Sequence, residues 1–273
     1  MFAWHALSAM SAPLRIIYPQ AESDADSRGD YYVKVLELAL SKAALDHHLQ
    51  ASHARMAKSR ALLQLESNNG IDVVWAMTTR EREASLTPVR IPIDKGLLGW
   101  RIFLVNKRDQ GEFGKIDSIE KLRSHAAGQG HDWPDATILR DNGLTVVPAP
   151  SYESLFLMLQ VGRFHYFPRG IGEIWDEARR HADLDIVVEQ SLALHYPACV
   201  YFFVNRNNLT LAALLERGLR RAISDGSFNE LFNAFHGESI KRANLRTRNV
   251  IELYNPLLPK DTPVNQRELW FER

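Results

Sequence analysis

A charged segment that directly follows an apolar run could hold an anionic ligand. Residues 78–83 read Thr-Thr-Arg-Glu-Arg-Glu and come after the apolar run 71–77. In open α/β sheets, ligands bind at the carboxyl ends of the strands, and a guanidinium matches a carboxylate with two parallel hydrogen bonds. An arginine in this segment therefore predicts a carboxylate site. The alternative is the start of a surface helix whose charges pair with each other.

A second arginine, Arg169, occupies a comparable place. It lies in the segment 167–170, Phe-Pro-Arg-Gly, at the end of another expected strand and ahead of a helix with Glu173. Between the two arginine segments, Gly130 and His131 can present free backbone N–H groups at a helix N-terminus, which is a ready site for an anion. These residues together predict a site for a small anionic molecule.

Most sequence signatures of enzymes and metal sites are missing. The chain has no Gly-x-Ser-x-Gly, no phosphate-binding loop and no His-Glu-x-x-His, which are the commonest hydrolase, nucleotide and zinc motifs. The single cysteine, Cys199, excludes an intramolecular disulfide and a cysteine zinc cluster. His195 stands four residues before it, but a cysteine in an apolar strand is by default a buried, inert thiol. We expect no metal and no cofactor.

Composition limits the class of protein further. The 273 residues are 45% hydrophobic, and 33 basic side chains balance 33 acidic ones. This balance gives no general attraction to nucleic acid or acidic membranes, and no apolar run approaches the roughly 20 residues that span a bilayer. We expect a monomeric globular protein without a nucleic-acid partner and without membrane insertion.

Strand and helix patterns alternate along the chain, as in an α/β protein. Apolar runs predict strands and amphipathic runs predict helices. The expected strands are 14–18, 71–77, 98–105, 144–147, 164–167 and 198–204, and the main expected helices are 30–43, 57–67, 135–141, 151–162 and 209–224. Residues 126–130 are expected to form a turn, and the C-terminal third is expected to stay helical. This order predicts mainly parallel sheets with helices on both faces.

Two long apolar strands suggest that the chain forms two lobes. The runs 98–105 and 198–204 bracket an α/β block of their own. If both runs cross between lobes, residues 13–104 with 199–273 form the first lobe and 105–198 the second. A cleft between two lobes is a common place for a ligand site.

The order of these motifs resembles the bacterial extracellular solute-binding proteins of family 3, over about residues 14–255. The likeness rests on the opening strand and helix, on Thr79 to Arg82 after Ile-Asp-Val-Val, on residues 116–122, and on Gly-Arg-Phe at 162–164. It implies a periplasmic-binding-protein fold of type II, with two α/β lobes joined by two crossing hinge strands. It also implies that the lobes close on a ligand.

The resemblance implies roles for individual residues. Arg82 matches the position that holds an α-carboxylate. Further hydrogen bonds to this carboxylate would come from donors around Thr78 and Thr79 and from the amides of Gly130 and His131. The family's usual acidic residue for a ligand ammonium falls at Gly170, beside Arg169, and His165 stands in place of another usual aspartate.

This departure bears on the chemistry of the ligand. A cationic Arg169 would repel an ammonium and favour a second anionic group, with Glu173 as the alternative partner of an ammonium. Three aromatic residues, Tyr18, Tyr31 and Trp75, are candidates to sandwich an apolar ligand part or else belong to the core.

Three functions remain open from the sequence. The first is a receptor for a small carboxylate-bearing solute, such as an amino acid, that serves an ABC importer or a membrane sensor. The second is an enzyme on the same fold, such as a lyase similar to cyclohexadienyl dehydratases, with Glu173 as its acid. The third is an interaction module without a ligand.

The resemblance implies a periplasmic or otherwise extracytoplasmic location. Residues 1–12 end in small side chains, as an export signal does, but they lack a basic beginning. They are either a shortened signal or a flexible terminus.

Overall fold

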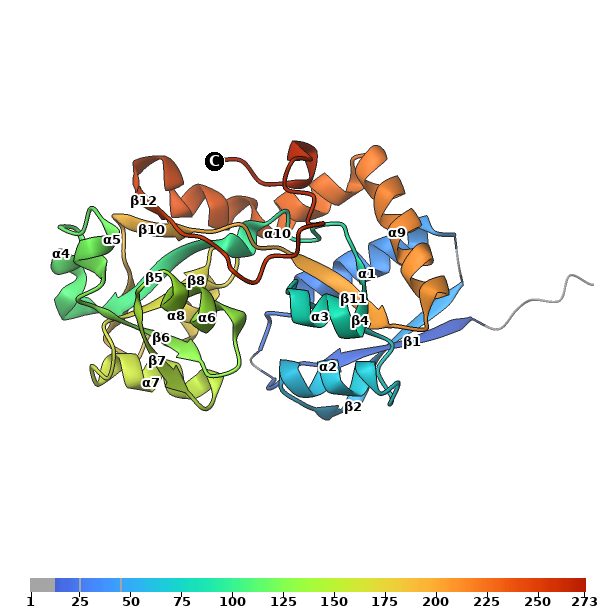
Figure 1. Ribbon diagram of the computed structural model, residues 1–273, viewed down its shortest axis with the longest axis horizontal. Helices are drawn as coiled ribbons and strands as arrows, with labels where there is room; N and C mark the ends of the chain where they lie inside the picture. Colours follow the sequence, from blue (N-terminus) through green and yellow to red (C-terminus); the bar gives the residue numbers. More distant parts are fainter. Residues whose placement is uncertain (1–12, 25, 45) are drawn as a thin grey trace, which may run out of the picture.

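The chain folds into two α/β lobes that lie side by side (Figure 1). The computed structural model describes residues 13–24, 26–44 and 46–273, so the expectation for residues 1–12 lies outside the described residues. The strands are β1 (Leu14–Gln20), β2 (His47–Arg55), β3 (Val73–Met77), β4 (Leu86–Val89), β5 (Trp100–Asn106), β6 (Ala126–Gly130), β7 (Thr145–Ala149), β8 (Tyr166–Gly170), β9 (Ile186–Val188), β10 (Leu192–His195), β11 (Val200–Asn205) and β12 (Asn249–Glu252). The helices are α1 (Asp30–Lys42), α2 (Lys58–Glu66), α3 (Arg80–Ser85), α4 (Gln110–Phe113), α5 (Ile119–Leu122), α6 (Pro134–Asp141), α7 (Tyr152–Gln160), α8 (Ile174–Arg180), α9 (Leu209–Ser224) and α10 (Ser227–Ala243).

The first lobe surrounds the strands β1 to β4 and β11. Strand β1 pairs in parallel with β2, and β11 lies between β3 and β4 and runs antiparallel to both. Helix α1 packs on α9 because both have an apolar face, which in α1 contains Tyr31, Val35, Leu36, Ala39 and Leu40.

The second lobe contains a seven-stranded sheet in the order β12-β10-β5-β8-β6-β7, with β9 beside β5. The pairs β6–β7, β6–β8 and β10–β12 are parallel. Strand β5 runs antiparallel to β8, β9 and β10.

The expected two-lobed α/β fold is confirmed. The expected crossing strands correspond to β5 and β11. Both strands run antiparallel to their neighbours, so the sheets are mixed and not mainly parallel as expected.

Two parts of the chain differ from their sequence expectation. Residues 126–130 form the inner strand β6 instead of a turn. Their small side chains have low strand propensity, but the neighbouring strands β7 and β8 pair with their backbone. The C-terminal third does not stay helical beyond Ala243. Strand β12 pairs with β10, so residues 249–252 join the sheet of the second lobe although 199–273 were expected in the first.

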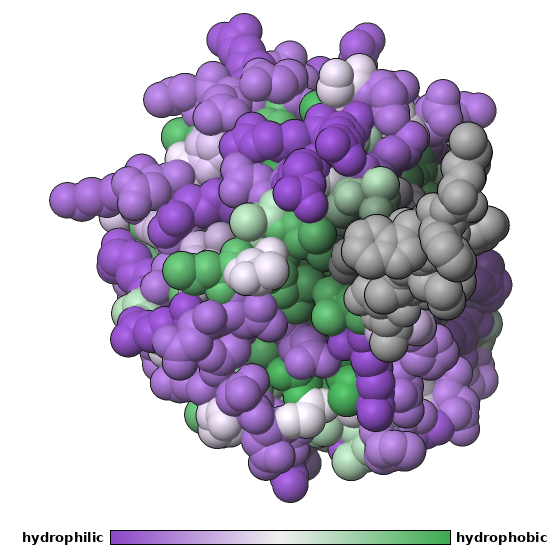
Figure 2. Space-filling model, turned by 90° about the vertical axis from the view of Figure 1, so that its right-hand side faces the viewer, coloured by the Kyte–Doolittle hydropathy of each residue, from purple (hydrophilic) through white to green (hydrophobic). Residues whose placement is uncertain are grey.

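The outer end of the first lobe is mostly hydrophilic, with apolar side chains gathered near its middle (Figure 2). Leu14, at the start of β1, is 41% exposed. The side chains of β3 and of the inner face of α1, such as Val35, Leu36 and Leu40, are buried instead. The main apolar cluster contains residues of helices α1 and α9 and of strands β3, β5 and β11.

A close approach of two helices makes Gly218 a sensitive position. A Cβ atom at Gly218 of α9 would lie 1.8 Å from the carbonyl oxygen of Ala39 in α1. We expect Gly218→Ala to push the helices apart and to lower the free energy of unfolding by about 1–3 kcal/mol. The control is Gly237→Ala in α10, where a Cβ meets nothing within 4 Å. Urea unfolding measures both variants, and equal stability of the two would contradict this packing.

Candidate ligand-binding site

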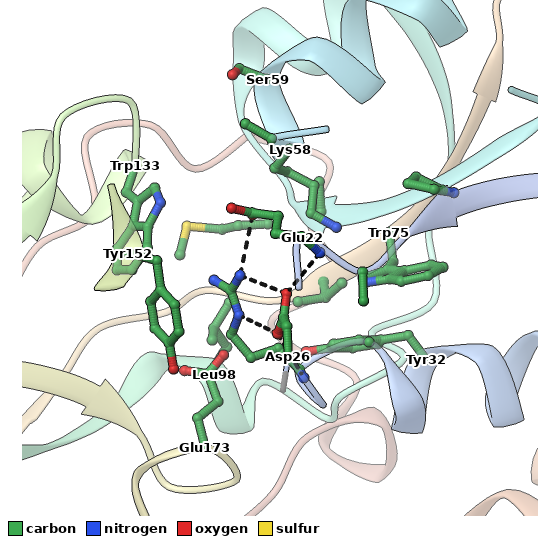
Figure 3. A pocket seen from close by; sticks show the side chains of 18 of the residues that line it. Glu22, Asp26, Tyr32, Lys58, Ser59, Trp75, Leu98, Trp133, Tyr152 and Glu173 are labelled. Atoms are coloured by element: carbon green, nitrogen blue, oxygen red, sulfur yellow. Dashed lines mark hydrogen bonds and ion pairs between the residues drawn. The ribbon is translucent and has the colours of Figure 1, made fainter. Parts of the chain in front are cut away.

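A cavity of about 650 Å³ lies between the two lobes. The first lobe lines it with the segment after β1, the start of α2 and the carboxyl end of β3. The second lobe lines it with residues that follow β6 and β7 and with the end of β8. Both walls therefore come mainly from the carboxyl ends of strands, where α/β sheets bind their ligands. Figure 3 shows side chains from both lobes converging on this space.

Arg82 lies in the first-lobe wall of the cavity. Thr79 caps α3, because its Oγ1 accepts a hydrogen bond from the backbone N–H of Arg82 at 3.2 Å. The guanidinium donates one hydrogen bond to the carbonyl oxygen of Met77 at 2.7 Å. Burial lowers the pKa of Arg82, an effect that Asp135 and other nearby carboxylates oppose. In the described part of the chain no carboxylate forms an ion pair with Arg82, so its remaining N–H groups are available to a ligand.

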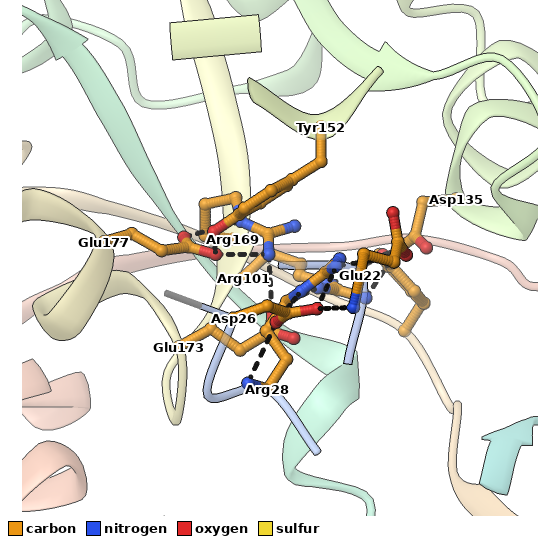
Figure 4. Close-up of polar contacts among 10 residues, drawn as sticks. Glu22, Asp26, Arg28, Arg101, Asp135, Tyr152, Arg169, Glu173 and Glu177 are labelled. Atoms are coloured by element: carbon orange, nitrogen blue, oxygen red, sulfur yellow. Dashed lines mark hydrogen bonds and ion pairs between the residues drawn. The ribbon is translucent and has the colours of Figure 1, made fainter. Parts of the chain in front are cut away.

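Arg169 is held by carboxylates on the second-lobe side. Its Nε and Nη2 donate to both oxygens of Glu177 at 2.7 and 2.6 Å, and Glu173 lies 3.0 Å away. Tyr152 donates a hydrogen bond to the same Glu177 at 2.7 Å (Figure 4). Burial by itself would raise the pKa of Glu177, but the charge and hydrogen bonds of Arg169 hold it below its usual value.

This pairing changes the expected role of Arg169. The sequence suggested that Arg169 would repel an ammonium and select a second anionic group on the ligand. The guanidinium lies 2.6 Å from Glu177 and 3.0 Å from Glu173, and Glu173 is also 4.0 Å from Arg101. Arg169 is therefore not a free cation in the cavity.

A second buried ion pair lies at the hinge. Arg101 of β5 donates to Asp135 at 2.6 Å and to the hydroxyl oxygen of Tyr196 at 2.9 Å, and Tyr196 also donates to Asp135. Burial alone would lower the pKa of Arg101, but Asp135 and its neighbours raise it. Asp135 comes from the second lobe and Tyr196 from the chain that returns to the first. The pair therefore stabilises the floor of the cavity.

Arg28 extends from the loop after β1 across the cavity. It forms two hydrogen bonds with Asp26, at 2.7 and 2.8 Å, and one with Glu22 at 3.2 Å. Its guanidinium also lies 4.1 Å from the centre of the Tyr152 ring in the second lobe. This cation–π contact is a direct link between the lobes at the cavity.

Aromatic rings cover the first-lobe end of the cavity. The rings of Tyr32 and Trp75 stack with centroids 5.9 Å apart, and Tyr18 lies 6.0 Å from Trp75. The ammonium of Lys58 lies 4.7 Å from the centre of a Trp75 ring. An apolar part of a ligand can pack on this surface.

Six of the ten residues proposed from the sequence line this one cavity, and both arginines are among them. They are Tyr18, Trp75, Arg82, His131, Arg169 and Glu173. Arg82 and Arg169 come from different lobes, so the cavity joins two segments that the sequence could only associate through strand ends.

Tyr31, Thr78, Thr79 and Gly130 are not in the cavity lining. Tyr31 packs in the core on the buried face of α1 and donates to the carbonyl oxygen of Ile93 at 2.7 Å. Its neighbour Tyr32 lines the cavity instead. Thr78 donates to Glu83 at 2.6 Å, and the hydroxyl oxygen of Thr79 is used as the helix cap.

The expected backbone donors before α6 are not free. Gly130 ends β6, which pairs with β7, and the N–H of His131 donates to the carbonyl oxygen of Ala149 at 3.2 Å. The sheet therefore uses backbone groups that the sequence assigned to a ligand. His131 lines the cavity, and its ring Nδ1 lies 3.3 Å from the carbonyl oxygen of Ala149.

Several site residues were missed in the sequence. Glu22, Asp26 and Arg28 lie between the expected strand 14–18 and the expected helix 30–43, in a segment that follows the carboxyl end of a strand. Tyr152 stands in the same relation to β7. The rule that ligands bind at the carboxyl ends of strands points to residues 78–83, and it points equally to the segments that follow β1 and β7.

The described residues give no sign of a metal site, a reactive thiol or a membrane helix. Over residues 13–24, 26–44 and 46–273, three or more metal-ligating side chains nowhere gather into a possible site. Cys199 is buried, and burial raises its pKa well above its usual value. Over the same ranges, every helix is too short or too polar to cross a bilayer.

Comparisons with known proteins agree on the fold. No family model and no curated protein sequence matches the chain. Solved structures do match. One is an ancestral arginine-binding protein bound to arginine, with 16% identity and a TM-score of 0.61 over 83% of this chain and 99% of that chain. Another is a Salmonella typhimurium periplasmic binding protein with high arginine specificity, with 13% identity and a TM-score of 0.63 over 82% of this chain and 100% of that chain.

A third similar structure is a histidine kinase sensor domain with similarity to periplasmic binding proteins (14% identity, TM-score 0.60, 83% of this chain and 96% of that chain). The matched structures share an architecture with this chain at low sequence identity. The chain therefore has the two-lobed fold of the periplasmic solute-binding proteins.

Proposed function

We propose that this protein is a receptor that captures a small carboxylate-bearing solute between its two lobes. The observation that carries the proposal is a cavity that has walls from both lobes and contains the guanidinium of Arg82, which forms no ion pair with any described residue. A solute that contacts both walls stabilises the closed arrangement more than the open one. Binding then shifts the equilibrium between the two arrangements.

Arg82 is the group best suited to hold the carboxylate. The other arginines of the cavity, Arg28, Arg101 and Arg169, each have a carboxylate within 3.2 Å. Arg82 keeps free donors in a partly buried position, where a charge-assisted hydrogen bond is stronger than in bulk water. The aromatic surface of Tyr18, Tyr32 and Trp75 takes the apolar part of the solute.

The fold also supports a proposal for the cellular role. Its structural neighbours include periplasmic binding proteins and a histidine kinase sensor domain. We place the receptor outside the cytoplasm, where it passes its solute to an ABC importer or reports it to a membrane sensor. It returns the solute unchanged, in contrast to an enzyme.

Native mass spectrometry followed by thermal shift tests this function. Amino acids, dicarboxylates and aromatic acids form the panel, and a compound at about 1,000 times its dissociation constant adds about 4 kcal/mol to the stability of the folded state. We expect a monomer that is stabilised by at least one carboxylate, which is recovered unchanged. A consumed compound would indicate an enzyme, and the absence of any stabilising carboxylate would contradict the receptor function.

A further inference from the structure

Lys58 is a second cationic group of the cavity that has no acidic partner. It is the first residue of α2, and its side chain reaches into the cavity (Figure 3). Its ammonium lies over a Trp75 ring, 4.7 Å from the ring centre. Among the described residues no carboxylate lies within ion-pair distance of Lys58.

The acids nearest to Lys58 are already used. Asp26 and Glu22 attract the ammonium, but both bind the guanidinium of Arg28, at 2.7 and 3.2 Å. Lys34, the other lysine of the cavity wall, is paired with Glu37 at 2.9 Å. Lys58 and Arg82 are therefore the two cavity cations that lack an ion pair in the described part of the chain.

The backbone around Lys58 also favours an anion. The residue before it, Ala57, provides no side-chain cap for α2, and the first turn has no acidic residue. The first-turn N–H groups of a helix lack partners within the helix, and they carry a partial positive charge. Met56, Ala57, Lys58 and Ser59 all line the cavity, so this uncapped end opens onto it.

We propose that Lys58 and the uncapped start of α2 form a second anion subsite, so that the solute is a small dicarboxylate held by Arg82 at one end and Lys58 at the other. This inference rests on the proposed receptor function and adds the chemical class of the solute. Arg28 contributes to the selection, because its guanidinium already occupies the space beside Asp26, Glu22 and the Tyr152 ring where a cationic ligand group would otherwise bind.

The protonation of Lys58 gives this subsite a separate signature. Burial and the charges of Arg28 and Arg82 lower the pKa of Lys58 to about 7, while Asp26 and Glu22 oppose the shift. The Trp75 ring is the remaining group that faces the ammonium. A bound carboxylate favours the charged form and raises this pKa, so a dicarboxylate that binds at pH 8 takes up about one proton.

The experiment compares α,ω-dicarboxylates of four to seven carbons with monocarboxylates of the same lengths. Isothermal titration at pH 8, in buffers of different ionisation enthalpy, gives both affinity and proton uptake. We expect at least one dicarboxylate to bind at least tenfold more tightly than its monocarboxylate and to take up a proton. Lys58→Met should lose both effects, and Lys58→Arg should keep the preference without the proton uptake.

The matched control is Arg60→Met, which removes an exposed cation from the first turn of the same helix, outside the cavity lining, and should leave the preference unchanged. Equal binding of the two series by the natural protein, or an unchanged preference in Lys58→Met, would overturn the second subsite alone. If no member of either series binds but an amino acid or an aromatic acid stabilises the protein, the second subsite fails alone. If no carboxylate of the whole panel binds, the proposed carboxylate receptor fails as well.

Discussion

Replacing Arg82 by alanine is expected to weaken binding of the carboxylate solute by about 2–5 kcal/mol, which is roughly 30-fold to 4,000-fold in Kd. The guanidinium is the one arginine of the described cavity lining without a carboxylate partner, and it is held in place by its hydrogen bond to the Met77 carbonyl oxygen. Without it, the solute's carboxylate enters a partly buried site with no countercharge. Isothermal titration of the best-binding compound measures the loss.

Arg80 offers a matched control for this substitution. It lies two residues before Arg82 in α3, is exposed and does not line the cavity. Arg80→Ala should leave the Kd within about twofold, since an exposed charge contributes little at this range. Similar losses in the two variants would mean that Arg82 acts through the general charge of α3 and not through contact with the solute.

The largest expected effect on stability comes from Glu177→Gln. Arg169 and Glu177 have side chains that are 3% and 0% exposed, and two hydrogen bonds join them. Removing one charge of a buried pair leaves the other without compensation, which costs about 3–5 kcal/mol. Glu173 remains 3.0 Å from Arg169, so we expect the lower end of that range. Urea unfolding at pH 7 measures the change.

The pH dependence of the same variant is a second test. The folded-state pKa of Glu177 is below its usual value, so this pair stabilises the fold above the usual pKa of a glutamate and less as pH falls through the folded value. Glu177→Gln should therefore lose less stability on acidification than the natural protein. Glu216→Gln, which breaks the exposed pair with Arg220 at 2.6 Å, should change the stability by less than about 0.5 kcal/mol. A loss of the same size in both variants would contradict the role of burial.

The sequence predicts those parts of the fold that have a strong local pattern. Helix α9 begins and ends at the expected residues, 209 and 224, because its apolar positions repeat at helical spacing and Asn208 caps it. The hinge strands β5 and β11 were visible as continuous apolar runs, since both are buried along their whole length.

Strand β6 could not be predicted because its neighbours determine it. Its sequence, Ala-Ala-Gly-Gln-Gly, has small residues of low strand propensity. The structure shows why they are small: a Cβ at Gly128 would lie 2.2 Å from the Phe164 ring. Such a packing constraint comes from a residue 36 positions away in the chain, and a local pattern does not contain it.

The candidate site was predictable only as far as strand ends allow. The strand-end rule points to Arg82 and Arg169, which do line one cavity. The sequence did not show which carboxylates form ion pairs with each charged group. Glu177 pairs with Arg169 from the next helix, and Tyr32 lines the cavity while Tyr31 is buried in the core. Arg82 and Lys58, the two basic side chains of the cavity without an ion pair among the described residues, are identified only after all ion pairs are assigned.

A crystal structure of the protein with the carboxylate that stabilises it most tests the central claim directly. We predict that the compound lies between the lobes. Its carboxylate should be within hydrogen-bond distance of the Arg82 guanidinium, and the apolar part of the compound should pack against Trp75. A compound bound elsewhere, or one in the cavity whose carboxylate does not contact Arg82, would contradict it.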